Sequence, residues 1–130
     1  MFNSLKKNKA MNKKRRNSVK DLLDRIKEQS DKIKNLISDI SEADTEMSTI
    51  YDELSLIKEE EEECYGNMPD TLKECDRGIE SELAIDELEA AMEAISNIRE
   101  YLSPMCSNYE ESTKGDFEDA KNSLTNIVEY

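Results

Sequence analysis

The densest group of side chains that could do chemistry is the acidic run from Lys58 to Cys64, in which five glutamates follow one another. Consecutive residues of a helix point around its axis, so these carboxylates do not converge on one cation. They would also lie at the negative end of a helix dipole, where a positive partner is favourable. The run predicts a solvated charged surface or a docking patch for a basic segment, and no metal site. Its members are Glu59, Glu60, Glu61, Glu62 and Glu63.

The other reactive side chains form no catalytic or cofactor-binding constellation. Cys64, Cys75 and Cys106 contain no CxxC pair, and the chain has no histidine. A zinc site, a disulfide framework and a His-activated nucleophile are therefore not indicated. The three glycines form no phosphate-binding loop. We expect a protein that is not an enzyme, has no cofactor, metal or catalytic residue, and keeps its cysteines reduced.

The first 20 residues are strongly basic. They hold eight Lys or Arg and no acid, whereas the remaining 110 residues hold ten basic and 31 acidic residues. The segment has no aromatic side chains for base stacking after Phe2 and no bZIP-type basic motif. Three interpretations stay open: a disordered arm (1–17) that is solvated or docks on a protein partner, a nucleic-acid contact through residues 6–20, or contact with an anionic membrane surface. Its strongest cluster is Lys13, Lys14, Arg15 and Arg16.

No apolar run follows this basic segment, and no apolar stretch approaches 18 residues. This pattern predicts neither a Sec signal peptide nor a membrane span. We expect a cytoplasmic protein, or a nuclear one if the source is eukaryotic.

Six consecutive heptads predict one long helix from about residue 18 to about residue 64. A capping box between Ser18 and Asp21 would begin this helix. Gln29 is the only polar residue among the twelve a and d positions. The a row is Val19, Ile26, Ile33, Ile40, Met47 and Leu54, and the d row is Leu22, Gln29, Leu36, Ala43, Ile50 and Ile57. Apolar residues that follow the d positions in alternate heptads (Leu23, Ile37, Tyr51) extend the stripe to the e row, which favours a multi-helix bundle over a parallel zipper.

The segment Tyr65 to Asp70 contains Gly66, Asn67 and Pro69, and it predicts a chain reversal with a left-handed residue at position 66 or 67. A second helix from about 70 to 103 would complete an antiparallel coiled-coil hairpin over residues 18–103. The step from Ile79 to Ile85 predicts a local irregularity near Gly78. Pro104 should kink or end this helix.

Segment 104–130 predicts a third helix through Phe117, Ala120, Leu124 and Ile127, with Gly115 and Asp116 at its start. The chain has only three glycines and two prolines, which supports an all-α fold, expected as an elongated bundle.

The start of the first helix has no partner in such a hairpin. Either the third segment or another chain must cover Val19, Leu22, Leu23 and Ile26. We therefore expect a scaffold or adaptor subunit that works in a homo- or hetero-oligomer by helix packing. Two self-association contacts are expected, one through these four apolar residues and one between the basic arm and residues 59–63 of another copy. The alternative function is a nucleic-acid-associated factor.

A further alternative is a secretion-linked hairpin. A small acidic helical hairpin over residues 18–103 resembles the hairpin substrates and adaptors of bacterial type VII secretion in architecture. Where that family has Trp-x-Gly at the turn, this chain has Tyr65 and Gly66. The resemblance implies a hairpin fold and a secretion-linked role.

Overall fold

The computed structural model of the chain describes residues 12–129, and every regular element in that range is helical. The elements are α2 (Lys13–Gly66), the single turn α3 (Asp70–Lys73), α4 (Asp76–Asn108), the π-helical turn η1 (Tyr109–Thr113) and α5 (Lys114–Val128). The predicted all-α class is confirmed. The chain divides into two compact units: unit 1 is Met1–Asp39 with Met105–Tyr130, and unit 2 is Ile40–Pro104.

Helix α2 begins five residues earlier than predicted. The backbone N–H of Arg15 donates to Oδ1 of Asn12 at 2.8 Å, which makes Asn12 the capping residue. Ser18 lies inside the helix, where its hydroxyl donates to the carbonyl oxygen of Lys14. The predicted capping box at Ser18 therefore does not form. Residues 13–17 are helical rather than part of a disordered arm, and residues 1–11 of the predicted arm lie outside the described residues.

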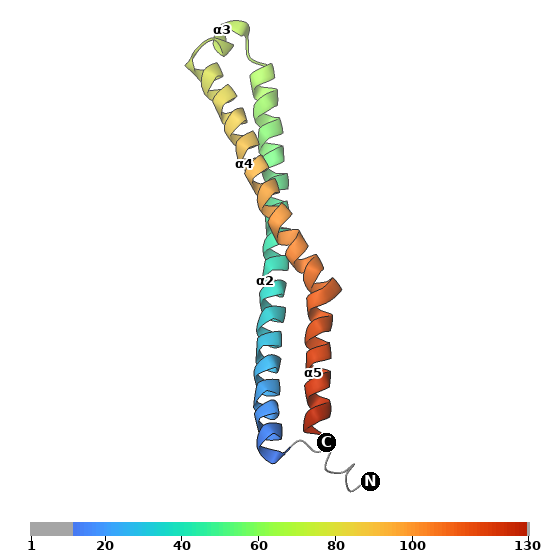
Figure 1. Cartoon of the computed structure of the whole chain (residues 1–130). Coiled ribbons are helices and arrows are strands. Elements are labelled where there is room, and N and C mark those ends of the chain that lie inside the picture. Colours follow the sequence, from blue (N-terminus) through green and yellow to red (C-terminus); the bar gives the residue numbers. More distant parts are fainter. Residues whose placement is uncertain (1–11, 130) are drawn as a thin grey trace. The chain divides into compact units, whose positions relative to one another are not determined.

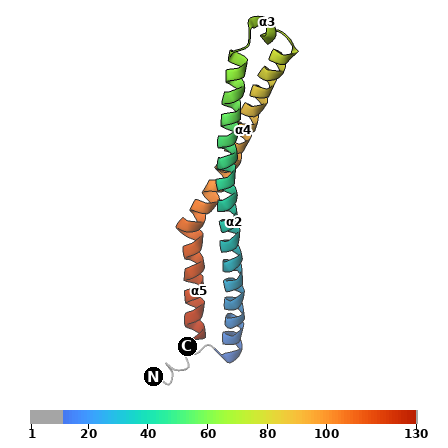
Figure 2. The ribbon, with the colours of Figure 1, turned by 180° about the vertical axis from the view of Figure 1, so that it is seen from behind.

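Unit 2 is an antiparallel helical hairpin. Figures 1 and 2 show the second half of α2 beside the first part of α4. The chain reverses between Gly66 and Asp70, where the sequence predicted a turn. No described residue has a positive φ, so the predicted left-handed residue at Gly66 or Asn67 is absent from this reversal.

A break at Glu74 and Cys75 separates α3 from α4, where the sequence predicted one continuous helix. Gly78 explains the tight connection. It is buried, and a Cβ at this position would overlap the carbonyl oxygen and Cα of Lys73. The backbone of α3 can pass this close to α4 only because residue 78 has no side chain.

The two helices of unit 2 pack along a seam, which is the line of side chains on each helix that faces the other helix. On α4 the seam consists of Gly78, Ser81, Ile85, Leu88, Met92, Ile95, Arg99 and Leu102. All of these are buried or half-buried, at steps of three and four residues. The predicted irregularity near Gly78 was inferred by placing Ile79 in the seam, but Ile79 is 50% exposed. Gly78 and Ser81 occupy the seam instead, and α4 is regular from Asp76.

On α2, the seam consists of the a and e rows, not the predicted a and d rows. Every described a-row residue is half-buried. In the e row, Leu23 and Ser30 are buried, and Ile37, Asp44, Tyr51, Lys58 and Tyr65 are half-buried. The whole d row is exposed, including Gln29. Helix α2 therefore turns a second, largely apolar row to solvent.

In unit 1, α5 lies alongside the first half of α2 (Figures 1 and 2). Pro104 neither ends α4, which continues to Asn108, nor separates it from the third segment. The π-helical turn η1 contains one residue more than a regular helical turn. As a result, the covered residues Tyr109, Thr113 and Phe117 follow one another at two successive steps of four. Within unit 1, Tyr109 is buried, and Thr113 and Phe117 are half-buried. Helix α5 begins at Lys114, one residue before the predicted start at Gly115, and Asp116 lies in its first turn.

Candidate interaction surface

One edge of the hairpin in unit 2 carries polar contacts between α2 and α4. The guanidinium of Arg99 donates from Nε to Oδ1 of Asp44 at 2.9 Å, and the hydroxyl of Ser103 donates to Oδ2 of Asp44 at 3.2 Å. The hydrogen bond from Arg99 lowers the pKa of Asp44, while the same carboxylate raises the pKa of Arg99. Arg99 is half-buried in the seam of α4, and its charge is accommodated there by the carboxylate of Asp44.

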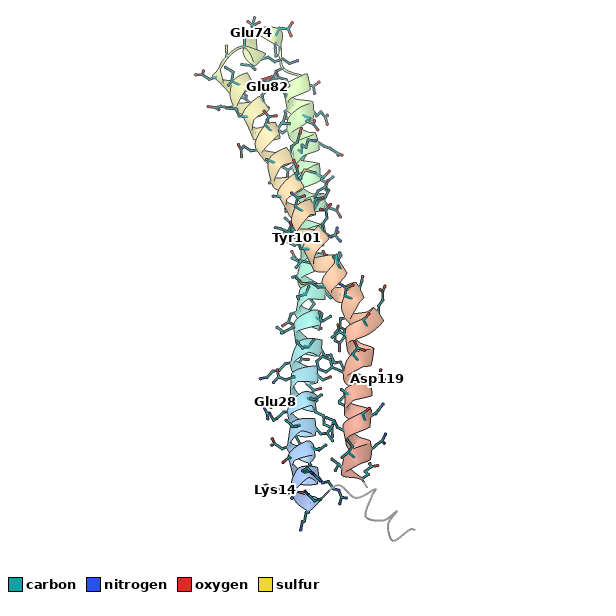
Figure 3. All side chains as sticks on the ribbon, in the orientation of Figure 1. Lys14, Glu28, Glu74, Glu82, Tyr101 and Asp119 are labelled. Carbon is teal, nitrogen blue, oxygen red and sulfur yellow. The ribbon has the colours of Figure 1, made fainter. Side chains whose placement is uncertain are left out.

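The same edge continues toward the turn. Nζ of Lys58 lies 3.5 Å from Glu89, and the hydroxyl of Tyr65 donates to Glu82 at 2.7 Å. The hydrogen bond to Glu82 raises the pKa of the Tyr65 phenol. Glu82 is labelled near the turn in Figure 3. These contacts pair one helix with the other and fix their register, and they offer no nucleophile with an adjacent base.

The opposite edge of the hairpin is apolar. Across α2 the rows follow in the order d, a, e, so the d row lies furthest from the polar edge. In an antiparallel pair, the matching row on α4 at that edge is Ala84, Ala91 and Ile98. We call the d row of α2, from Leu22 to Ile57, and this row of α4 the outer rows.

Large apolar side chains of the outer rows face solvent in each unit. In unit 2, Ile50 is 36% exposed, Ile57 49% and Ile98 42%. Tyr101, labelled in Figure 3, lies next to the α4 row and is 73% exposed. In unit 1, Leu22 is 46% and Leu36 55% exposed. A shallow groove there is lined by Leu22, Arg25, Ile26, Glu28, Gln29 and Leu124.

Charge is distributed very unequally. Unit 2 holds 20 acidic and four basic residues, a net charge of −16. The described part of unit 1 holds 11 acidic and 11 basic residues. The acidity of the protein is therefore a property of the hairpin, and a basic partner surface would be attracted to unit 2 in particular.

The four apolar residues that the sequence left without a partner differ in their surroundings. Leu23 is only 5% exposed, and Val19 and Ile26 are half-buried in unit 1, where α5 lies beside α2. Leu22, the d-row member, is the one that remains exposed. Leu23 is thus covered within the chain, while Leu22 is accessible to a partner.

The charged candidates are mostly exposed. Lys13, Lys14 and Arg15 are exposed in the first turn of α2, and Arg16 is half-buried. Among the five glutamates, Glu59, Glu60, Glu62 and Glu63 are exposed. Glu61 is half-buried in the seam and accepts a hydrogen bond from the hydroxyl of Ser81. Four of the five glutamates are therefore open to a partner.

The described residues contain no group of three or more His, Cys, Asp or Glu side chains that could hold a metal ion. None of the helices in residues 12–129 combines the length and the apolar character needed to cross a membrane. Comparison with protein-family models, curated proteins and solved structures found no match to the chain.

The sequence did not predict that the outer rows would be exposed to solvent. The sequence showed an apolar stripe three rows wide; the a row was assigned to the seam correctly, but the d row was assigned to it in place of the e row. A usable signal was present: the e row carries Asp44, Lys58 and Tyr65, and α4 carries Arg99, Glu89 and Glu82 at matching antiparallel positions. Pairing each of these polar residues of α2 with its counterpart on α4 would have placed the e row in the seam.

Proposed function

We propose that this protein is a non-enzymatic interaction subunit, of the scaffold or adaptor kind, that binds other protein chains through its outer rows. The observation that carries the proposal is the heptad spacing of apolar residues that remain exposed after both units have packed. Scattered exposed apolar residues are ordinary in folded proteins, but a continuous row of them is typical of an interaction surface.

The energy of one such residue is small. Covering the exposed half of a Leu or Ile side chain stabilises a complex by about 1 kcal/mol. Ordering two chains costs several times this amount, so no single residue would hold a partner. A partner would therefore have to cover several residues of the rows together, among them Ile50, Ile57 and Ile98 in unit 2.

Nucleic-acid association through residues 6–20 is the second candidate. It is favoured by one observation: Lys13, Lys14 and Arg15 are exposed in a helical turn that contains no acidic residue. Such a cluster suits a phosphate backbone. The net charge of −16 on unit 2 opposes this function over the surface of that unit.

A size measurement in an extract of the source cells distinguishes the two functions. Under the first, the tagged chain travels in a particle larger than its own 15.0 kDa, and nuclease treatment leaves the particle intact. Combining Leu36→Ser with Ile57→Ser should release the chain. The matched control is Leu56→Ser, because Leu56 is 60% exposed but lies outside the outer row. Loss of the particle after nuclease treatment or after deletion of residues 1–17, with no effect of the row variants, would support the nucleic-acid function instead.

A further inference from the structure

We propose that the outer row of unit 2 binds the unit 1 part of α2 from a second copy of this chain, with the two α2 helices antiparallel. The inference rests on the proposed function and identifies the partner of the same surface. It places residues 22–36 of one copy against residues 50–64 of the other. Each copy carries both surfaces, so a dimer can form this contact twice.

Charged residues lie beside the apolar outer row of α2. On α2, the residues three positions after each outer-row residue form a flanking row on the side away from the seam. In unit 1 this flanking row contains Arg25 and Lys32, and in unit 2 it contains Glu53 and Glu60. All four are exposed. The same helix therefore presents an apolar row with a basic flank in one unit and with an acidic flank in the other.

One register of the two α2 helices matches both the apolar residues and the charges. When Leu36 of one copy lies opposite Ile50 of the other in an antiparallel pair, Gln29 lies opposite Ile57. In that register, the flanking residues pair as opposite charges: Arg25 lies opposite Glu60, and Lys32 lies opposite Glu53. A shift by one heptad toward the turn leaves one such pair, Lys32 with Glu60. A shift in the other direction keeps two pairs of opposite charge, but it places Leu36 opposite Ala43 instead of Ile50. Charge matching therefore excludes the first shift, and apolar matching excludes the second.

The cations are available for this contact. Arg25 lies 3.7 Å from Asp21 and Lys32 lies 3.6 Å from Glu28, in pairs within one helix whose side chains are all more than 60% exposed. Exposed pairs of this kind contribute little and exchange readily with solvent. A glutamate from another copy can therefore compete for either cation.

The charges also disfavour a symmetric dimer in which unit 2 of one copy contacts unit 2 of the other. Two hairpins meeting through unit 2 would bring two surfaces of net charge −16 together. Unit 1 of a second copy avoids this repulsion, because the described residues 12–39 hold nine basic and five acidic residues. A different protein with a basic amphipathic helix could use the same surface, and the experiment below separates that outcome.

Charge exchange between two variants of the full-length chain tests the proposal. One variant combines Arg25→Glu with Lys32→Glu, and the other combines Glu53→Lys with Glu60→Lys. Sedimentation equilibrium should show the wild type dimerising at low salt, more weakly at high salt, because these charges are exposed to screening. Each variant alone should dimerise at least tenfold more weakly. An equimolar mixture of the two should recover dimers, since every proposed pair then again joins opposite charges. Circular dichroism should show equal helix content, because all four side chains are exposed.

A gain of affinity gives a second, independent readout. In the proposed register, Asp39 of one copy lies opposite Glu46 of the other, and both are acidic and exposed. Asp39→Lys should therefore strengthen dimerisation roughly fivefold or more. Ser38→Lys, at a neighbouring exposed position on another side of α2, adds a positive charge as the control.

Two results would overturn the second-copy proposal: a wild type that stays monomeric at all concentrations, or a mixture of variants that recovers no dimer. If the chain is monomeric alone and still forms a row-dependent particle in the extract, the proposed function stands and the partner is a different protein. If neither dimer nor row-dependent particle exists, both proposals fail.

Discussion

Two adjacent leucines provide the sharpest test of how α2 packs. Leu22 and Leu23 follow one another in the same helix, yet Leu23 is 5% exposed and Leu22 is 46% exposed. The a and d pattern of the sequence makes Leu22 the core residue, while the structure places Leu23 in the seam. Replacing each by Ala changes helix propensity equally, so the difference between the two variants reports on packing alone.

The expected magnitudes follow from burial. Leu→Ala removes three carbons, worth about 2.4 kcal/mol at about 0.8 kcal/mol for each buried carbon. At Leu23 the loss is nearly complete and a cavity remains, so the free energy of unfolding should fall by about 2.5 to 4 kcal/mol. Leu22 is about half covered and opens to water without an enclosed cavity, so Leu22→Ala should cost about 1 kcal/mol.

Urea denaturation followed by circular dichroism measures both values. The protein should be dilute, so that any self-association does not add to the stability. We expect Leu23→Ala to lower the unfolding midpoint clearly more than Leu22→Ala, with the same helix content for both folded variants. Equal losses, or a larger loss for Leu22→Ala, would show that the d row is in the core and would refute the seam described above.

The remaining predictions concern the turn and the polar edge of the hairpin. Gly78→Ala should lower the free energy of unfolding by about 2 kcal/mol, because its methyl group overlaps the Lys73 backbone. Gly115→Ala, where the added Cβ meets no atom within 4 Å, should raise the free energy of unfolding by about 0.5 to 1 kcal/mol. Thermal melts compare the two variants, and equal shifts of the melting temperature would contradict the close approach of Gly78 to the Lys73 backbone. Arg99 lowers the pKa of Asp44 below its ordinary 3.8, so the pair stabilises the fold above that pH, and the stabilisation is lost as pH falls through the lowered pKa. Asp44→Asn should therefore be less stable than wild type at pH 7, and urea titrations at decreasing pH should show the difference shrinking below pH 3.8; a constant difference would exclude the ion pair as its source.

The sequence was sufficient for the parts of the fold that depend on local signals. Six heptads and the scarcity of glycine and proline predicted long helices, and the cluster around Gly66 and Pro69 predicted the reversal between them. Local signals were ambiguous at the start of α2, since Asn12 and Ser18 are both good capping residues. Pro104 does not end α4, because a helix can accommodate the missing N–H of one proline when tertiary packing supports both sides; the predicted kink stays a prediction.

The candidate surface depended on information that no single helix carries. Which two of three apolar rows enter a seam is decided by the partner helix, and Arg99, Glu89 and Glu82 of α4 select the e row of α2 through Asp44, Lys58 and Tyr65. The π-helical turn is similar: its extra residue is needed to keep Tyr109 and Phe117 on one side, a requirement of packing in unit 1.

The most direct test of the account is the mass of the purified full-length chain, measured by light scattering at low salt over a range of concentrations. Wild type is compared with a variant that combines Leu36→Ser and Ile50→Ser, two exposed residues placed opposite each other in the proposed contact. The account predicts that the wild-type mass rises from 15.0 kDa toward twice that value with concentration, while the variant stays at one chain mass with unchanged helix content. A wild type that remains at 15.0 kDa throughout, or a variant that dimerises equally well, would contradict the assignment of the outer rows as the surface joining two copies.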